Sequence, residues 1–147
     1  MIHQSLNSHD DCSPFLTQLK IVVDDKGGLL IGEFTALPFS PKRLFIQWGA
    51  TAETTRGHHA HLSCWQILFP ISGCINVDLE FCGGKKSFIL DEPSLGLVIP
   101  PLVWATQTLL SGSAKLLVLA SETFDENDYI RDRLKFNEIL KSHTSHS

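Results

Sequence analysis

The chain has 147 residues, 43% of them hydrophobic, and a formal net charge of −4 at pH 7. This length and composition indicate one domain that can bury a core of its own. The acidic balance, without a run of lysine or arginine, excludes a protein that coats nucleic acid, although one or two placed arginines could still bind a small anion.

The first 14 residues are polar and are predicted to form a flexible leader, without the charged-then-apolar pattern of a signal peptide. No later stretch approaches the roughly 18 consecutive apolar residues that a membrane span requires. We therefore expect a soluble cytoplasmic protein with no membrane partner. Residues 15–147 are expected to form a single domain.

Short apolar runs separated by turn residues fill the chain from there on. Residues 19–23 and 29–34 flank "DDKGG", which predicts a hairpin with glycine at positive-φ positions. Further strands are predicted over "RLFIQW", "WQILFPI", "CINVDLEF", "SFIL", "LGLVIP", "VWATQTLL" and "AKLLVLA". In residues 75–81 apolar and polar side chains alternate, as in a half-buried strand. So many short strands predict an all-β sandwich or barrel.

Only after Asp125 does the spacing of apolar residues change. Residues 126–142 place apolar side chains at approximately helical intervals, with Asp125 as the expected N-cap. The predicted fold class is therefore an all-β domain with one C-terminal α-helix.

The four cysteines form neither a CxxC pair nor a zinc-binding spacing. Cys64, Cys74 and Cys82 lie in apolar, strand-like stretches, where a cysteine usually packs as a small buried hydrophobe. We favour that interpretation over a disulfide.

The segment "RGHHAH", residues 56–61, concentrates three histidines. Side chains alternate between the faces of a strand, so His59 and His61 should share one face, with small Ala60 on the other. Such a pair could bind a metal ion, could act as acid and base near neutral pH, or could be purely structural.

The spacing of the surrounding residues bears on the metal. His-x-His, four residues, Gln66, six residues and Gly73 match the first motif of the cupins, whose metal-binding members have Glu at the position of Gln66. Ala105 stands where a further histidine ligand would be expected. Two imidazoles and an amide hold a divalent cation poorly, so we predict a site without metal.

The chain resembles the WxcM-like cupins, which include dTDP-4-keto-6-deoxyglucose 3,4-ketoisomerases. The resemblance rests on "LPFSPKR", "RGHHAH", Gln66 with the following "SG", "LDEPSLGLVIPPLVW" and "LASETFDENDYIR". It implies a small jelly-roll (cupin) barrel that acts as a homodimer without metal or cofactor. It also implies that His59 and His61 are catalytic. Substrate contacts are expected from the motif residues Arg43, Arg56, Gln66 and Trp104.

The implied reaction suits histidine chemistry. Moving a ketone from C4 to C3 of a dTDP-linked 4-keto-6-deoxyhexose requires removal of the C3 proton and return of a proton to C4 through an enediol. One histidine could serve as the base and the other as a relay, with neighbouring donors stabilising the enediolate.

The sequence also departs from the family. The ketoisomerases usually carry tyrosine in the strand before the histidine motif, where this chain has Phe45 and Ile46, and its one tyrosine, Tyr129, falls in the predicted helix. A phenol is therefore expected to be missing from the site. A non-catalytic sugar-nucleotide-binding cupin, and an isomerase or epimerase of a different nucleotide sugar, remain alternatives. The apolar hairpin between Leu19 and Phe34 is the expected dimer contact.

Overall fold

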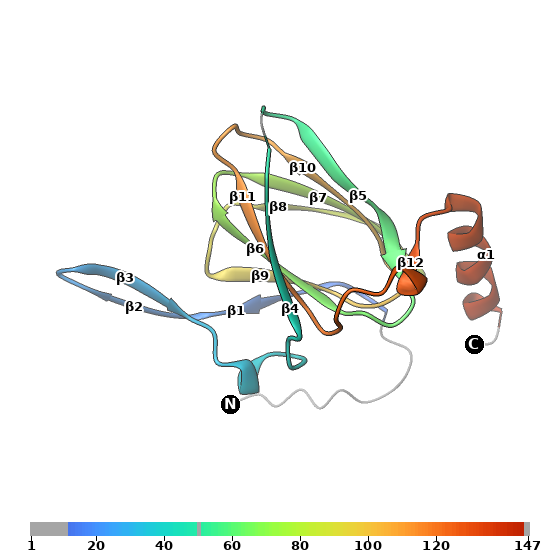
Figure 1. Ribbon diagram of the computed structural model, residues 1–147, viewed down its shortest axis with the longest axis horizontal. Coiled ribbons are helices and arrows are strands. Elements are labelled where there is room, and N and C mark those ends of the chain that lie inside the picture. Colours follow the sequence, from blue (N-terminus) through green and yellow to red (C-terminus); the bar gives the residue numbers. More distant parts are fainter. Residues whose placement is uncertain (1–11, 50, 146–147) are drawn as a thin grey trace.

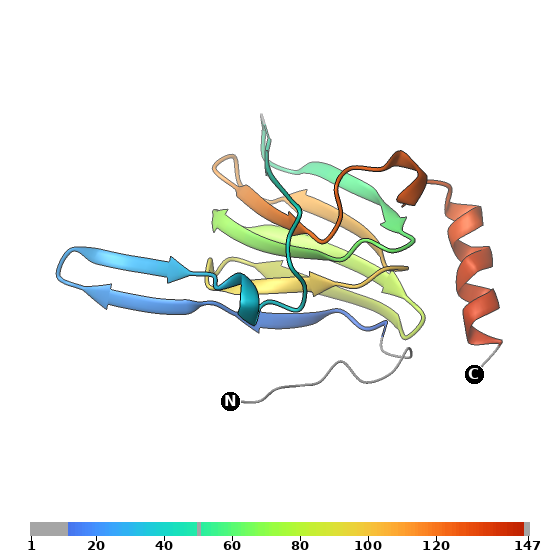
Figure 2. The same cartoon turned by 60° about the horizontal axis from the view of Figure 1, so that its bottom comes forward.

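The computed structural model describes residues 12–49 and 51–145 of the chain (Figure 1). Two five-stranded antiparallel sheets face each other, a separate hairpin projects from one end, and one α-helix lies at the other (Figures 1 and 2). This arrangement confirms the predicted all-β fold with a C-terminal helix. No helix in the described residues is long and apolar enough to cross a membrane.

The two sheets take their strands from distant parts of the sequence. The first has the order β1 (Phe15–Gln18), β9 (Leu95–Ile99), β6 (Gln66–Ser72), β11 (Lys115–Ala120) and β4 (Arg43–Trp48). The second has the order β12 (Tyr129–Ile130), β5 (Thr54–His61), β10 (Trp104–Leu109), β7 (Ile75–Phe81) and β8 (Gly84–Leu90). The remaining elements are β2 (Lys20–Asp24), β3 (Gly27–Ile31), the 3-10 turns η1 (Phe34–Ala36) and η2 (Glu126–Asp128), and α1 (Arg133–Thr144).

Alternating side chains build the core between the sheets. In β7, Ile75, Val77, Leu79 and Phe81 are buried and pack with residues of β6, β9, β10 and β11. Burial of these side chains contributes about 1.5–3 kcal/mol each. The predicted alternation in this strand is confirmed.

The predicted hairpin forms as β2 and β3, joined by a two-residue turn after which Gly27 adopts a φ of 120°. It extends away from the sheets as an arm (Figure 2). Apolar side chains on it remain open to solvent, with Val23 73% and Leu29 64% exposed. The arm therefore offers an apolar surface that the rest of the chain does not cover.

The prediction of one helix over residues 126–142 is wrong in its first part. Asp125 caps only the short turn η2, and α1 begins at Arg133 with Asp132 as its N-cap. Between them, Tyr129 and Ile130 pair with β5 as the strand β12. Tertiary hydrogen bonds to this segment override its helical spacing.

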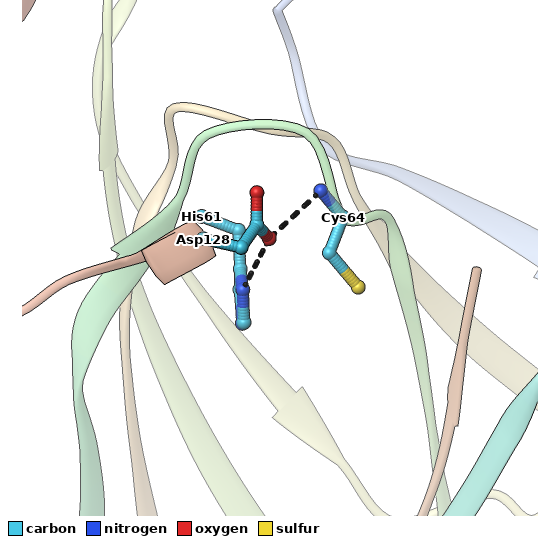
Figure 3. Close-up of side chains that lie close together, drawn as sticks. All are labelled: His61, Cys64 and Asp128. Atoms are coloured by element: carbon cyan, nitrogen blue, oxygen red, sulfur yellow. Dashed lines mark hydrogen bonds and ion pairs between the residues drawn. The ribbon is translucent and has the colours of Figure 1, made fainter. Parts of the chain in front are cut away.

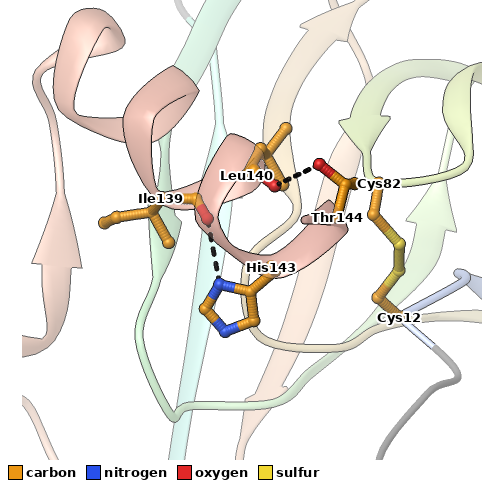
Figure 4. The surroundings of a disulfide bond; sticks show 6 residues. All are labelled: Cys12, Cys82, Ile139, Leu140, His143 and Thr144. Atoms are coloured by element: carbon orange, nitrogen blue, oxygen red, sulfur yellow. Dashed lines mark hydrogen bonds between the residues drawn. A yellow bond between two sulfur atoms is a disulfide. The ribbon is translucent and has the colours of Figure 1, made fainter. Parts of the chain in front are cut away.

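The cysteine prediction is wrong for Cys82, which forms a disulfide with Cys12, 70 residues earlier. The last turns of α1, with Leu140 and Thr144, lie beside this bond (Figure 4). The prediction holds for Cys64, which is buried and free. The predicted leader lies mostly outside the described residues. The cytoplasmic location of the protein stays a prediction. The Cys12–Cys82 disulfide counts against it, because disulfides persist mainly in oxidising compartments.

Candidate active site

The histidine motif lies on β5, at an irregularity in the strand. Across the ladder with β10, His59 pairs with Ala105 and Gly57 pairs with Thr106, so His58 is an extra, unpaired residue. Gly57 and His58 have positive φ angles of 95° and 57°. A Cβ atom on Gly57 would lie 2.6 Å from the carbonyl oxygen of Ala105, so only glycine fits here.

This bulge decides where Arg56 faces. In a regular strand Arg56 would lie on the face opposite His59, but the extra residue restarts the alternation. Arg56 pairs with Gln107, and His59 pairs with Ala105. The buried side chains of Gln107 and Ala105 face the first sheet. Arg56, His59 and His61 therefore share the inner face, and their roles stay predictions.

The two histidine rings lie 5.0 Å apart in an edge-to-face arrangement. The Nδ1 atom of His59 is 3.0 Å from the carbonyl oxygen of Gly57, and that of His61 is 3.1 Å from Oδ2 of Asp128. A carbonyl and a carboxylate accept hydrogen bonds, so each ring donates from Nδ1. Each neutral ring then carries its basic lone pair on Nε2.

Asp128 orients His61 from the η2 turn (Figure 3). Its carboxylate also accepts hydrogen bonds from the backbone N–H of Ser63, the hydroxyl of Ser63 and the backbone N–H of Cys64. Burial alone would raise its pKa, but the Ser63, Cys64 and His61 donors outweigh that effect and lower the pKa of Asp128. The carboxylate is thus ionised at neutral pH.

Burial keeps both histidines neutral. Desolvation lowers the pKa of His59, against the opposing effect of its hydrogen bond to Gly57. Desolvation and the neighbouring His59 lower the pKa of His61 to about 4, although Asp128 opposes the shift. The contact between His61 and Asp128 is therefore a hydrogen bond donated by a neutral imidazole to the carboxylate, rather than an ion pair. At neutral pH the Nε2 atom of each ring is therefore unprotonated.

The first sheet adds polar groups opposite the histidines. Arg43 of β4 and Gln66 of β6 lie in one row, each paired with Ala120 of β11. Among the described residues, four buried side-chain polar atoms have no hydrogen-bond partner: Nε of Arg43, Oε1 of Gln47, Nε2 of His61 and Oε1 of Gln107. An unsatisfied buried polar group costs about 1–3 kcal/mol, so four of them on the inner face indicate that a polar ligand binds there.

Tyr129 brings a phenol into this site, contrary to the expectation that one would be missing. β12 pairs Tyr129 with His61. The ring of Tyr129 lies 4.4 Å from that of His61 and 4.9 Å from that of His59. Sequence reasoning placed Tyr129 on a helix and so overlooked it. The "DYIR" motif shared with the family was the signal that could have identified it.

Trp104 does not fit its predicted role as a substrate contact. It pairs with Glu80 on the outer face of the second sheet, away from the histidines. There its ring lies 5.4 Å from that of Phe136 and 5.0 Å from the guanidinium of Arg133. It lines an outer pocket of about 450 Å³, and neither His59 nor His61 is among the residues that line this pocket. Strand alternation places the side chain of Ala105, the next residue, on the inner face instead.

The ligand atoms of His61, Cys64 and Asp128 lie within 4.8 Å of one another, as in a metal site. The donor set argues against a metal ion. Nδ1 of His61 is 3.1 Å from the Asp128 carboxylate, whose two oxygens already accept hydrogen bonds from three other donors. A cation would have to displace these bonds. Absence of metal nevertheless stays a prediction.

Comparisons with known proteins show the family of the chain. The model of the FdtA family (WxcM-like, C-terminal) matches residues 11–141. A TDP-4-oxo-6-deoxy-alpha-D-glucose-3,4-oxoisomerase of Aneurinibacillus thermoaerophilus is 34% identical over 82% of this chain and 88% of its own length.

Solved structures are similar too. QdtA, a sugar 3,4-ketoisomerase from Thermoanaerobacterium thermosaccharolyticum solved with TDP, superposes with a TM-score of 0.84 and 34% identity over 88% of this chain and 96% of its own. A histidine-to-asparagine mutant of QdtA, solved with TDP-4-keto-6-deoxyglucose, gives a TM-score of 0.84 and 33% identity over 88% and 94% of the two chains. These likenesses confirm the predicted small cupin fold.

Proposed function

Since the chain belongs to the FdtA (WxcM-like, C-terminal) family, we propose that it is a sugar-nucleotide 3,4-ketoisomerase acting on a TDP-linked 4-keto-6-deoxyhexose. One observation carries this proposal: two neutral histidines, with basic Nε2 atoms, share the inner face with unpartnered buried polar atoms. Names of the relatives support the substrate class, and the mutant QdtA complex with TDP-4-keto-6-deoxyglucose supports the particular sugar.

The histidines perform the carbon chemistry of the proposed reaction. A neutral imidazole takes the proton from C3, which the C4 carbonyl acidifies, and the C–H electrons form an enediol. The resulting imidazolium lies in a desolvated site and next to a second ring, so it readily gives up a proton, either to solvent or to C4. His61 is held in its basic tautomer by Asp128, and His59 by the Gly57 carbonyl.

The arginines are assigned to binding and charge stabilisation. Arg56 carries an exposed guanidinium on the inner face, where its planar fork can contact the diphosphate in a bidentate manner. Arg43 and Gln66, which lie in one row of the first sheet, are assigned to hydrogen bonding with the sugar. The reaction moves protons only, so the proposal needs no metal or redox cofactor.

Incubation with TDP-4-keto-6-deoxyglucose tests the proposal. We expect NMR to show conversion to the 3-keto isomer, with deuterium from D2O appearing at C4, and no loss of activity after dialysis against a chelator. Binding of TDP without conversion would favour the non-catalytic binding protein instead. Conversion to an epimer without movement of the carbonyl would favour an epimerase.

We further propose a homodimer that forms through the β2–β3 arm. The apolar side chains left exposed on the arm, including Val23 and Leu29, support this surface as the contact with a second copy. Light scattering should give twice 16.3 kDa at micromolar concentration. A Leu29→Asp substitution should lower the mass toward the monomer, whereas Lys26→Asp at the polar turn should not. A wild-type monomer would contradict the proposal.

A further inference from the structure

Tyr129 faces the reacting end of the site although it comes from a separate, two-residue strand. Residues that oppose each other across a ladder share a face, and Tyr129 opposes His61. Its ring therefore lies on the inner face, in contact with both histidine rings at 4.4 and 4.9 Å. No other tyrosine exists in the chain that could supply a phenol.

Two guanidinium groups lie beside this phenol. An Nη1 atom of Arg43 lies 3.5 Å from the Tyr129 hydroxyl oxygen, and the guanidinium of Arg131 lies 4.3 Å from the ring centroid. Arg131 is paired with Glu126 at 2.7 Å. Arg43 forms no ion pair within the described residues, so its charge remains available to an oxyanion. The Tyr129 hydroxyl therefore lies within hydrogen-bonding reach of a guanidinium whose charge no described carboxylate offsets.

The proposed reaction needs such a group in addition to the histidines. Moving the ketone transfers a hydrogen from C3 to C4, but it also transfers a hydrogen from the oxygen on C3 to the oxygen on C4. Both imidazoles are neutral in the resting site, so neither begins with a proton on Nε2 to give to the C4 oxygen.

We propose that Tyr129 is the catalytic acid–base group that carries the hydroxyl proton of the substrate from one oxygen to the other. In the first half, imidazole takes the C3 proton, the C–H electrons form the C3–C4 double bond, and the C4 oxygen takes the phenol proton. In the second half, the Tyr129 phenolate takes the proton from the C3 oxygen, the C3 carbonyl forms, and the double-bond electrons take the proton from imidazolium at C4. Both protein groups return to their starting states, and no oxidant is needed.

This inference rests on the proposed function, and a Tyr129→Phe variant tests it separately. Phenylalanine keeps the ring contacts with the histidines and removes only the hydroxyl. Turnover should fall about 10²–10⁴-fold. Deuterium exchange at C3 of recovered substrate should fall much less, because the histidines still remove the C3 proton and Arg43 still neutralises the enediolate. We expect the ratio of exchange to turnover to rise by about tenfold or more.

Three outcomes would count against the inference. Turnover of Tyr129→Phe within about threefold of wild type would overturn it. So would equal losses of exchange and turnover, which indicate a structural role. Phe124, whose exposed ring packs 5.6 Å from that of Tyr129, supplies the control: a Phe124→Leu variant that raises the same ratio would assign the effect to ring packing. Failure of the wild-type protein to convert the substrate would instead refute the proposed function itself.

Discussion

The second sheet carries an aromatic ring beneath an arginine on each of its faces, and the two rings differ in what surrounds them. On the outer face, Trp104 lies under Arg133, whose charge is paired with Glu80. On the inner face, Tyr129 lies under Arg131, whose charge is paired with Glu126, and it contacts both histidines.

The residues around Trp104 and those around Tyr129 are of similar types, but they differ in how completely their buried polar atoms are hydrogen-bonded. The four buried polar atoms without partners in the described residues all belong to inner-face side chains, and none belongs to the cluster around Trp104. A protein that leaves buried polar atoms unpaired loses stability, so the arrangement persists where a ligand completes it. An arginine over an aromatic ring therefore does not by itself indicate a binding site. Buried polar atoms without hydrogen-bond partners nearby are the feature that does.

The largest expected effect comes from the inner face. Replacing His59 or His61 with Asn removes the base while keeping a small polar side chain. Turnover should fall about 10²–10⁴-fold for each variant, and deuterium exchange at C3 should fall with it. This parallel loss distinguishes the histidines from Tyr129. NMR of product and substrate in D2O measures both quantities. Near-normal turnover in both variants would remove the catalytic assignment and favour the binding protein.

The buried neutral histidine also makes stability depend on pH. The pKa of His61 falls from 6.5 to about 4 on folding, so between these values the unfolded chain binds a proton that the folded chain does not. The free energy of unfolding should therefore decrease as pH falls from about 6.5 to about 4, by about 3 kcal/mol at most. Urea denaturation at a series of pH values measures this. A His61→Asn variant should show a flatter profile, and an unchanged slope would contradict the assignment.

Asp128→Asn should have an intermediate effect. Asparagine has one oxygen where Asp128 uses two, so its amide N–H₂ would meet either the Ser63 donors or those of Cys64 and His61. We expect turnover to fall about 10–100-fold, as for other residues that orient a functional histidine, and stability to fall by about 1–3 kcal/mol. Asp125→Asn is the matched control, because Asp125 caps η2 without touching a histidine. Equal losses in both variants would indicate damage to the turn alone.

Local patterns in the sequence predicted most of the fold and the centre of the site. Alternation in residues 75–81 identified β7, and the glycines after Lys26 identified the hairpin. The His-x-His spacing was enough to place His59 and His61 on one face, because no irregularity falls between them. Strand periodicity alone would have separated Arg56 from that face, and the bulge at Gly57 and His58 corrects it.

Long-range contacts account for what the sequence did not reveal. Asp128 accepts hydrogen bonds from Ser63, 65 residues earlier, which holds Tyr129 in an extended segment rather than in the predicted helix. Cys12 reaches Cys82 across 70 residues. An analysis of residue spacing covers only a short stretch of sequence, so it detects neither the contact of Asp128 with Ser63 nor that of Cys12 with Cys82. Trp104 and Ala105 are a different case, because ordinary strand alternation places adjacent residues on opposite faces of the sheet, and the resemblance alone had assigned Trp104 to the substrate.

A substitution of Trp104 should have the smallest effect on activity, and it tests the difference between the outer and inner faces of the second sheet most directly. Its half-buried ring packs against Phe136 and beneath Arg133, so Trp104→Leu should lower the free energy of unfolding by about 1–3 kcal/mol. Because the side chain lies on the outer face, kcat/KM of the folded variant should stay within about threefold of wild type. The resemblance to the ketoisomerases predicted the opposite, a substrate contact whose loss raises KM. Steady-state kinetics and denaturation of the same preparation decide between them, with Trp104→Phe as the milder variant. A rise in KM of about tenfold without loss of stability would mean that substrate reaches the outer face, and the division between the two clusters would then fail.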